Sequence, residues 1–289
     1  MVLPVHDLNP LARRPYVTWA LIALNVAVFV FLEPVTGTFT GTSRGDVRAQ
    51  ANQLCEQQYF FDRYAAVPRE LLDGHQLPGP RPGPTAVAVQ GDEVQCAAAS
   101  YRKSPALSVL FAMFLHGGWA HLLGNMLFLL IFGNNVEDRM GRFRYLLFYL
   151  GCGYASAYGF ALLDHSSTTL VGASGAIAGV LGAYLVVFPR ARVVSLLTFL
   201  FFLPVRLPAW LVLGGWFLLQ YFYLAGFGQA AGARGDASGV AYGAHVIGFA
   251  VGALVVLPFV RRLRAAGPIG LRGQSGGRAH DRLRGSRWA

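Results

Sequence analysis

The chain of 289 residues is too apolar for a soluble globular domain. Hydrophobic residues make up 54% of it and charged residues only 13%, whereas about a quarter of the residues in a soluble domain are charged. The net charge of +10 could suit nucleic acid, but the arginines lie in short clusters between apolar runs and in the C-terminal tail. That distribution is typical of membrane topology. We therefore expect a polytopic protein in a lipid bilayer, with no nucleic-acid partner.

Six apolar runs are expected to form membrane helices. The first, 16–32, follows a polar lead, is long for a signal peptide and is not followed by a clear cleavage site. The other five are 119–132, 145–163, 171–188, 209–225 and 240–260. The expected fold class is therefore all-α, a polytopic bundle of six transmembrane helices within residues 16–262.

Two segments between these runs are expected to lie outside the spans. The segment 134–144 carries several charged residues and is interpreted as a charged turn. The apolar stretch 193–203 is marginal in length, and Pro204 and Pro208 follow it closely. Proline removes a backbone donor and breaks helices, so this stretch is expected to be a connection at the membrane edge.

The arginine clusters predict the orientation in the membrane. With six spans, the clusters in 13–14, 139–144, 190–206 and 261–264 all fall on one side, which the positive-inside rule makes cytoplasmic. The lead 1–15 and the basic tail 263–289 would then be cytoplasmic, and the tail disordered. Lys103 is the only lysine among many arginines, a bias that hints at a GC-rich bacterial genome. We expect a multi-pass protein of the bacterial inner or plasma membrane.

The first loop, 33–105, is long and would face the extracytoplasmic side. It contains Cys55 and Cys96, which could form a disulfide in an oxidising compartment or remain two unrelated free thiols. Within the loop, residues 59–72 are interpreted as a short amphipathic piece lying on the membrane surface.

Polar residues inside the spans suggest a functional site. Ser174 opens the fourth run and His245 lies near the outer end of the sixth, while His121 and Asn125 lie in the outer half of the second. His121 and Asn125 are four residues apart and therefore share one helix face. Ionisable residues within a span are costly, so four polar groups at a similar depth predict a site.

Glycines on two of these runs predict a close helix contact. Gly175 and Gly179 on the fourth run, and Gly248 and Gly252 on the sixth, have the spacing that lets two helix backbones approach. Such spacing is often only a packing device. Here it would also bring Ser174 and His245 within hydrogen-bonding reach.

Three motifs follow one another along these runs. They are His116, His121 and Asn125 on the second run, Gly172-Ala173-Ser174-Gly175 at the start of the fourth, and Ala244-His245 followed by Gly248 and Gly252 on the sixth. In this order they resemble the motifs of the rhomboid family of intramembrane serine proteases, and the similarity covers roughly residues 16–262. Trp216 and Gln220 on the fifth run are smaller echoes of the family pattern.

The resemblance implies roles for these residues. Ser174 would be the nucleophile and His245 the general base, and the absence of Asp or Glu from the spans favours a dyad over a triad. His121, Asn125 and the backbone N–H of Ser174 would stabilise the oxyanion, with His116 supporting the loop. Gly172 would leave room at the helix entry. No metal or cofactor is needed.

One departure from the family pattern affects the account of the base. Some rhomboids carry an aromatic residue one turn after the serine that stacks on the catalytic histidine, and this chain has Ala178 there. How His245 is oriented is therefore left open.

The expected partners are transmembrane protein substrates, cleaved near the outer half of the bilayer, and the sequence does not indicate an oligomeric state. Two other functions are considered. A catalytically silent rhomboid-like scaffold that binds clients usually lacks the serine or the histidine, and Ser174 and His245 are both present. A transporter would tend to show internal repeats, and none is evident.

Overall fold

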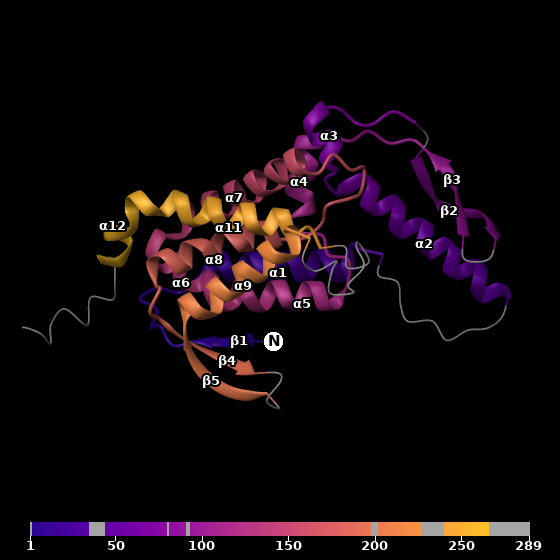
Figure 1. Cartoon of the computed structure of the whole chain (residues 1–289). Coiled ribbons are helices and arrows are strands. Elements are labelled where there is room, and N and C mark those ends of the chain that lie inside the picture. Colours follow the sequence, from indigo (N-terminus) through magenta and orange to yellow (C-terminus); the bar gives the residue numbers. More distant parts are fainter. Residues whose placement is uncertain are drawn as a thin grey trace, which may run out of the picture.

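The computed structural model describes residues 2–34, 44–79, 81–90, 93–197, 202–226 and 240–265. These residues are mostly helical. Long helices run side by side in one bundle, and a smaller unit of one helix and a β-hairpin projects from one end of it (Figure 1). Most of the predicted tail, 266–289, lies outside the described residues.

The bundle is made of the apolar segments that the sequence predicts as helices. Three of the described helices are long and apolar enough to cross a membrane, and three shorter apolar helices accompany them. The short ones are α1 (Tyr16–Phe31), α8 (Ser174–Val187) and α9 (Ala209–Leu224). The first long helix is α5 (Trp119–Phe128), which continues through the π-helical turn η1 (Leu129–Gly133) into α6 (Asn134–Met140), and the second is α7 (Arg142–Leu163). The third is α11 (Tyr242–Val256), which continues through η3 (Leu257–Phe259) into α12 (Val260–Ala265).

Helix α8 lies at the centre of the bundle. Ten of its residues, including Val180, Leu181 and Tyr184, are buried, as expected for a helix that is apolar all round. Its closest neighbour is α11, and glycines make that contact possible. A Cβ added at Gly252 would overlap the carbonyl of Gly179, and one added at Gly248 would overlap the carbonyl oxygen of Gly175. The two backbones therefore touch directly, as in other small-residue helix contacts.

The predicted charged turn at 134–144 is wrong, because most of it is helix α6. Glu137 is buried, and its carboxylate accepts hydrogen bonds from the backbone N–H groups of Val17 and Thr18 at 3.0 and 2.7 Å. These amides belong to the first turn of α1 and have no partner within that helix. The charge therefore caps another helix instead of facing water. The actual break is Gly141, whose positive φ of 79° ends α6.

The all-α expectation is corrected by two small sheets. One joins the N-terminal strand β1 (Val2–Asp7) to the hairpin of β4 (Arg192–Leu197) and β5 (Leu203–Pro208), in the antiparallel order β1-β4-β5. The stretch 193–203, interpreted as a plain connection, thus begins as a strand. Its β-branched residues favour a strand, and the alternate residues Val193 and Ser195 are buried. The prolines of β5 are tolerated because β5 lies at the edge of the sheet.

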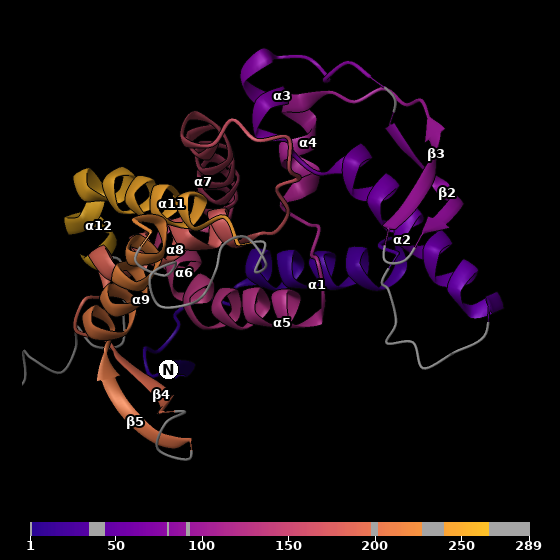
Figure 2. The same cartoon turned by 45° about the vertical axis from the view of Figure 1, so that its right-hand side comes forward.

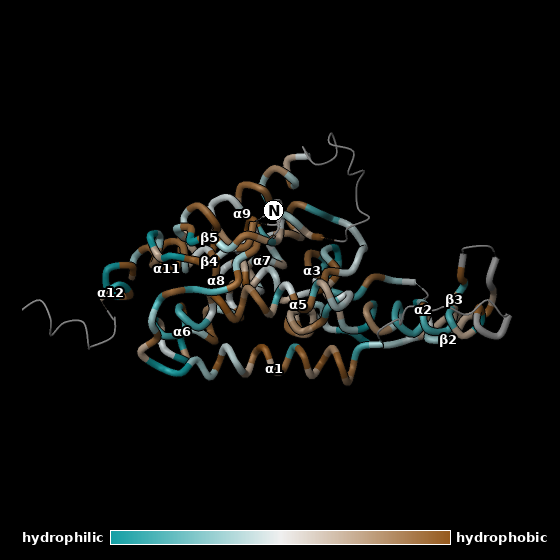
Figure 3. The backbone as a smooth tube through the Cα atoms, turned by 90° about the horizontal axis from the view of Figure 1, so that it is seen from below, coloured by the Kyte–Doolittle hydropathy of each residue, from teal (hydrophilic) through white to brown (hydrophobic). Residues whose placement is uncertain are grey.

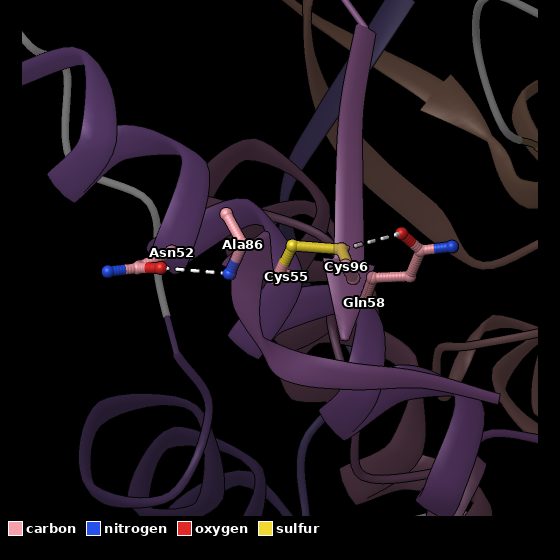
Figure 4. Close-up of a disulfide and its surroundings, with 5 residues drawn as sticks. All are labelled: Asn52, Cys55, Gln58, Ala86 and Cys96. Carbon is pink, nitrogen blue, oxygen red and sulfur yellow. Dashed lines mark hydrogen bonds between the residues drawn. A yellow bond between two sulfur atoms is a disulfide. The ribbon is translucent and has the colours of Figure 1, made fainter. Parts of the chain in front are cut away.

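The projecting unit contains the second sheet. Helix α2 (Arg44–Tyr64) packs against the hairpin of β2 (Arg81–Gln90) and β3 (Glu93–Ala99), as Figure 2 shows from a second side. Cys55 on α2 and Cys96 on β3 form a disulfide, and close to it Asn52 accepts the backbone N–H of Ala86 at 2.9 Å (Figure 4). Covalent and packing contacts thus hold α2 against the hairpin.

Helix α3 (Pro68–Asp73) connects the projecting unit to the bundle. Glu70 on α3 is buried and forms ion pairs with Lys103 at 2.9 Å and Arg81 at 3.0 Å. Just before α3, Ala66 forms an antiparallel bridge with Leu170 in the loop between α7 and α8. The unit is therefore attached to the loop that leads into Ser174. The predicted surface piece 59–72 is divided between α2 and α3, and α4 (Pro105–Ala112) follows.

Hydropathy changes along the molecule. The bundle helices are largely hydrophobic, whereas α2 at one end and α6 and α12 at the other are more hydrophilic (Figure 3). At the α12 end, Arg264 donates hydrogen bonds to the carbonyls of Val186 and Val187, the last residues of α8. A basic side chain at this position satisfies free carbonyls and suits the helix dipole.

Candidate active site

Ser174 and His245 meet where α8 and α11 begin. Ser174 is the first residue of α8, and His245 lies in the first turn of α11. The hydroxyl oxygen of Ser174 is 2.8 Å from Nε2 of His245. The residues are 71 positions apart in the sequence, and the direct backbone contact of Gly175 with Gly248 is what lets the two helices bring them together.

Helix α9 holds the other side of the His245 ring. Oε1 of Gln220 is 2.8 Å from Nδ1 of His245, and the indole of Trp216 packs on the ring with centroids 5.8 Å apart and planes 33° apart. Residues of α9 therefore orient His245, which answers the question that Ala178 left open. The sequence interpretation noted Gln220 only as an echo of a family pattern. The available signal was a lone amide in an otherwise apolar run.

Gly172 separates Ser174 from His121. Its φ of 115° lies in the region that favours glycine, and its backbone N–H donates to the carbonyl of Ala112 at 2.8 Å. A Cβ added at Gly172 would lie 2.7 Å from Nε2 of His121 and 3.6 Å from the hydroxyl oxygen of Ser174. His121 and Ser174 therefore border the same small space, which glycine leaves open.

Hydrogen-bond donors gather around this space. His121 and Asn125 project from α5 into the same cleft as Ser174. Nδ2 of Asn125 is buried and has no acceptor among the described residues. The backbone N–H of Ser174 belongs to the first turn of α8, where amides lack an acceptor within the helix. A buried donor without a partner is costly, and these donors suit an oxygen that gains negative charge.

His116 lies beside the site but does not line the cleft. It is buried between α4 and α5, and its ring packs edge-on against that of His121 with centroids 5.1 Å apart. Its backbone N–H donates to the carboxylate of Glu33 at 2.9 Å. Gly179 and Gly252 also lie away from Ser174, further along the contact between α8 and α11.

A single cleft of about 1530 Å³ contains the polar residues of the site. Among the residues that the structure describes, no group of three or more His, Cys, Asp or Glu side chains could hold a metal ion. A hydroxyl bonded to an imidazole, with donors one small space away, can carry out nucleophilic attack on a carbonyl.

Comparison with known proteins agrees with this geometry. The Rhomboid domain family matches residues 103–262. "RHOMBOID-like protein 6, mitochondrial" of Arabidopsis thaliana is 36% identical over 105 residues, which are 34% of this chain and 34% of that protein. "Putative rhomboid protease YdcA" of Bacillus subtilis (strain 168) is 39% identical over 71 residues, 25% of this chain and 36% of that protein.

A third relative, "RHOMBOID-like protein 4" of Arabidopsis thaliana, is 44% identical over 77 residues, 27% of this chain and 19% of that protein. The matched segments thus span about a third or less of the length of these curated relatives. The family match, in contrast, covers more than half of this chain and contains all three motifs. The chain belongs to the rhomboid family.

Proposed function

We propose that this protein is an intramembrane serine endopeptidase that cleaves the transmembrane segments of other membrane proteins. The observation that carries the proposal is the 2.8 Å contact between the hydroxyl of Ser174 and Nε2 of His245, whose Nδ1 is held by Gln220. An imidazole that donates from Nδ1 to an amide oxygen has a free lone pair on Nε2 for the serine proton. This is the tautomer that a general base needs.

The reaction would follow the two steps of acyl transfer. Nε2 of His245 takes the proton as the oxygen of Ser174 attacks the substrate carbonyl, and then gives it to the leaving amine. The oxyanion would occupy the space beside Gly172, near His121, Asn125 and the N–H of Ser174. Water activated by His245 then releases the acyl group. A dyad suffices here because Gln220 orients the base without an acidic third residue.

The proposed topology has six spans, with both chain ends in the cytoplasm and the projecting unit outside. The more hydrophilic α6 and α12 lie at the end of the bundle opposite α2 (Figure 3). The disulfide of Cys55 and Cys96 suits an oxidising, extracytoplasmic compartment. In this orientation the cleft opens near the outer surface of the cell membrane. A substrate span would have to unwind there, because the carbonyls of a helix are shielded and already bonded.

The test compares the wild-type chain with Ser174→Ala in reconstituted vesicles. A fluorophosphonate probe should label the wild type and not Ser174→Ala, and a panel of single-span proteins should include members that only the wild type cleaves. The exposed Ser100 provides a matched control, since Ser100→Ala should behave like the wild type. Labelling that survives in Ser174→Ala would contradict the proposal. An unlabelled wild type that cleaves no member would favour the silent scaffold.

A further inference from the structure

Helix α2 has two faces with different neighbours. Ala51 and Cys55 are buried against Ala86 of the hairpin, on the face that carries the disulfide. Five residues of α2 line the same cleft as Ser174: Leu54, Gln57, Gln58, Phe61 and Asp62. The first four lie on another face of the helix, and we call them the α2 stripe. Their spacing is i, i+3, i+4 and i+7, which is one continuous face of a helix. The cleft therefore has a wall outside the bundle.

The α2 stripe is accessible and has a mixed chemistry. Leu54 is 49% exposed although its side chain is fully apolar. Gln57 and Gln58 add two side-chain amides, each of which can both donate and accept hydrogen bonds. Such a surface can bind an extended peptide, because apolar side chains contact Leu54 and Phe61 while the amides pair with free backbone N–H and C=O groups. A helical peptide would offer no free backbone groups.

Gln58 of the stripe also borders a second depression. This smaller hollow, of about 300 Å³, is lined by Arg81, Pro82, Cys96 and Ala98, and it shares Gln58 and Val94 with the main cleft. Gln58 also lies beside the disulfide, with Oε1 4.0 Å from Sγ of Cys96 (Figure 4). The main cleft and the smaller hollow thus meet at Gln58 and Val94, beside the β-hairpin.

The wall is fixed relative to Ser174. The disulfide joins α2 to β3, and Glu70 pairs with Lys103 and Arg81 at the base of the unit. Ala66 pairs with Leu170 in the loop that leads to Ser174, with its N–H 3.2 Å from the carbonyl oxygen of Leu170. A segment bound along the stripe would therefore have a defined register relative to the cleaved bond. Fixed geometry of this kind reduces the entropy lost when a ligand is ordered.

We propose that the α2 stripe binds the extracytoplasmic flank of the substrate, the segment just outside the membrane, in an extended and partly apolar conformation. This inference rests on the proposed protease function and adds a determinant of specificity to it. The residues of the stripe do not touch the reacting atoms, and their contribution is to position the substrate. Substrates with an apolar, extended flank would be preferred over those whose span is followed directly by a folded domain.

The test uses two single-span reporters with the same cleaved segment. One carries an apolar extracytoplasmic flank of about ten residues, which covers roughly 33 Å when extended, and the other lacks it. The double variant Gln57→Ala with Gln58→Ala removes both amides from the stripe. We expect it to lose about tenfold in kcat/KM on the flanked reporter and to match the wild type on the flankless one. Leu54→Asp should have the same selective effect.

Controls separate this inference from the proposed function. Glu56→Ala changes an exposed residue of α2 that does not line the cleft, and it should match the wild type on both reporters. Fluorophosphonate labelling of Ser174 should be equal in all these variants, which shows that they are folded and active. Equal kcat/KM of the wild type and the stripe variants on the flanked reporter would overturn the inference. A wild type that is neither labelled nor active would overturn the proposed function, and the inference with it.

Discussion

Gln220 on α9 and His245 on α11 are joined through Oε1 and Nδ1 at 2.8 Å, so a helix outside the motif-bearing pair orients the imidazole. Trp216, one turn earlier on α9, packs against the same ring. An aromatic residue and an amide on α9 thus do what an aromatic residue after the serine does in some rhomboids. Any displacement of α9 from α11 would also remove the Nδ1 partner of His245.

Replacing Gln220 with leucine should lower kcat with little change in KM. Without an acceptor at Nδ1, the imidazole can adopt the tautomer in which Nε2 is protonated and unable to take the serine proton. We expect a loss of about ten- to thirtyfold, the equivalent of one hydrogen bond to the catalytic base. Cleavage kinetics with a single-span reporter measure it. Gln220→Glu keeps the side-chain shape and restores an acceptor, so it should recover most of the rate, whereas equal rates of the leucine and glutamate variants would show that the acceptor has no role.

Asn125→Ala should reduce kcat without abolishing labelling of Ser174. It removes one donor from the space beside Gly172, and loss of one oxyanion donor typically costs roughly 10²–10³-fold in rate. Ser174→Ala should be more severe, because it removes the attacking atom. Single-turnover cleavage of a reporter by both variants gives the comparison. A higher KM with an unchanged kcat would show that Asn125 contributes to substrate binding and not to the transition state.

The sequence alone could predict much of this site, because depth in the membrane and helix spacing bring Ser174, His245, His121 and Asn125 together. Gln220 was missed as a partner because a single amide in an apolar run has no feature that indicates which neighbour it faces. The interpretation of 134–144 as a charged turn is wrong for the opposite reason. Its charged residues suggest a turn, whereas the structure uses the carboxylate of Glu137 to cap α1. Local pattern does not show which distant backbone groups lack partners.

The strands and the position of the projecting unit could not be predicted from the sequence pattern. β1 and β4 are only six residues each and pair although residues 8–191 separate them in the sequence, so neither has a local signal that distinguishes it from a membrane-edge loop. The cysteines allowed the disulfide as one of two alternatives. Nothing in the spacing of Cys55 and Cys96 indicates that α2 also lines the cleft of Ser174, because that depends on how Ala66, between α2 and α3, pairs with the loop before Ser174.

Gly172→Ala should abolish the proposed activity. The new Cβ would lie 2.7 Å from Nε2 of His121, closer than such atoms normally approach, and the φ of 115° is strained for any residue with a side chain. His121 would have to move out of the space that it shares with Ser174. Gly151→Ala on α7 is a matched control, because an added Cβ there meets nothing within 4 Å. Cleavage rates and fluorophosphonate labelling should fall only in Gly172→Ala.

Removing the disulfide should loosen the projecting unit before the bundle. Cys55 and Cys96 close a loop with a sequence separation of 41 residues, for which chain entropy predicts a stabilisation of about 4 kcal/mol. In the double variant Cys55→Ser with Cys96→Ser, limited proteolysis should cut within 44–99 faster than in the wild type. Reduction of the wild type should have the same effect. Equal rates of cleavage would mean that packing of α2 on the hairpin suffices.

Glu33 should make stability depend on pH near neutrality. It lies just beyond the end of α1, and burial raises the pKa of its carboxyl from the usual 4.5 to about 7, although the hydrogen bond from the His116 N–H opposes the shift. Because the pKa of Glu33 is higher in the folded state than in the unfolded state, the contribution of Glu33 to the free energy of unfolding is fully present below the unfolded pKa. It is lost as the pH rises through the folded value.

Glu33→Gln isolates this effect. The glutamine oxygen can still accept the N–H of His116 but cannot ionise, so the variant avoids the cost of a buried carboxylate. Its advantage in free energy of unfolding over the wild type should grow from about pH 5 to about pH 8, by up to about 3 kcal/mol. Thermal melts of both proteins across this range, in the same detergent, give the comparison. A difference in stability between the two proteins that stays constant across this pH range would contradict the raised pKa of Glu33. A variant that is less stable at every pH would show that the carboxylate itself holds the loop of His116.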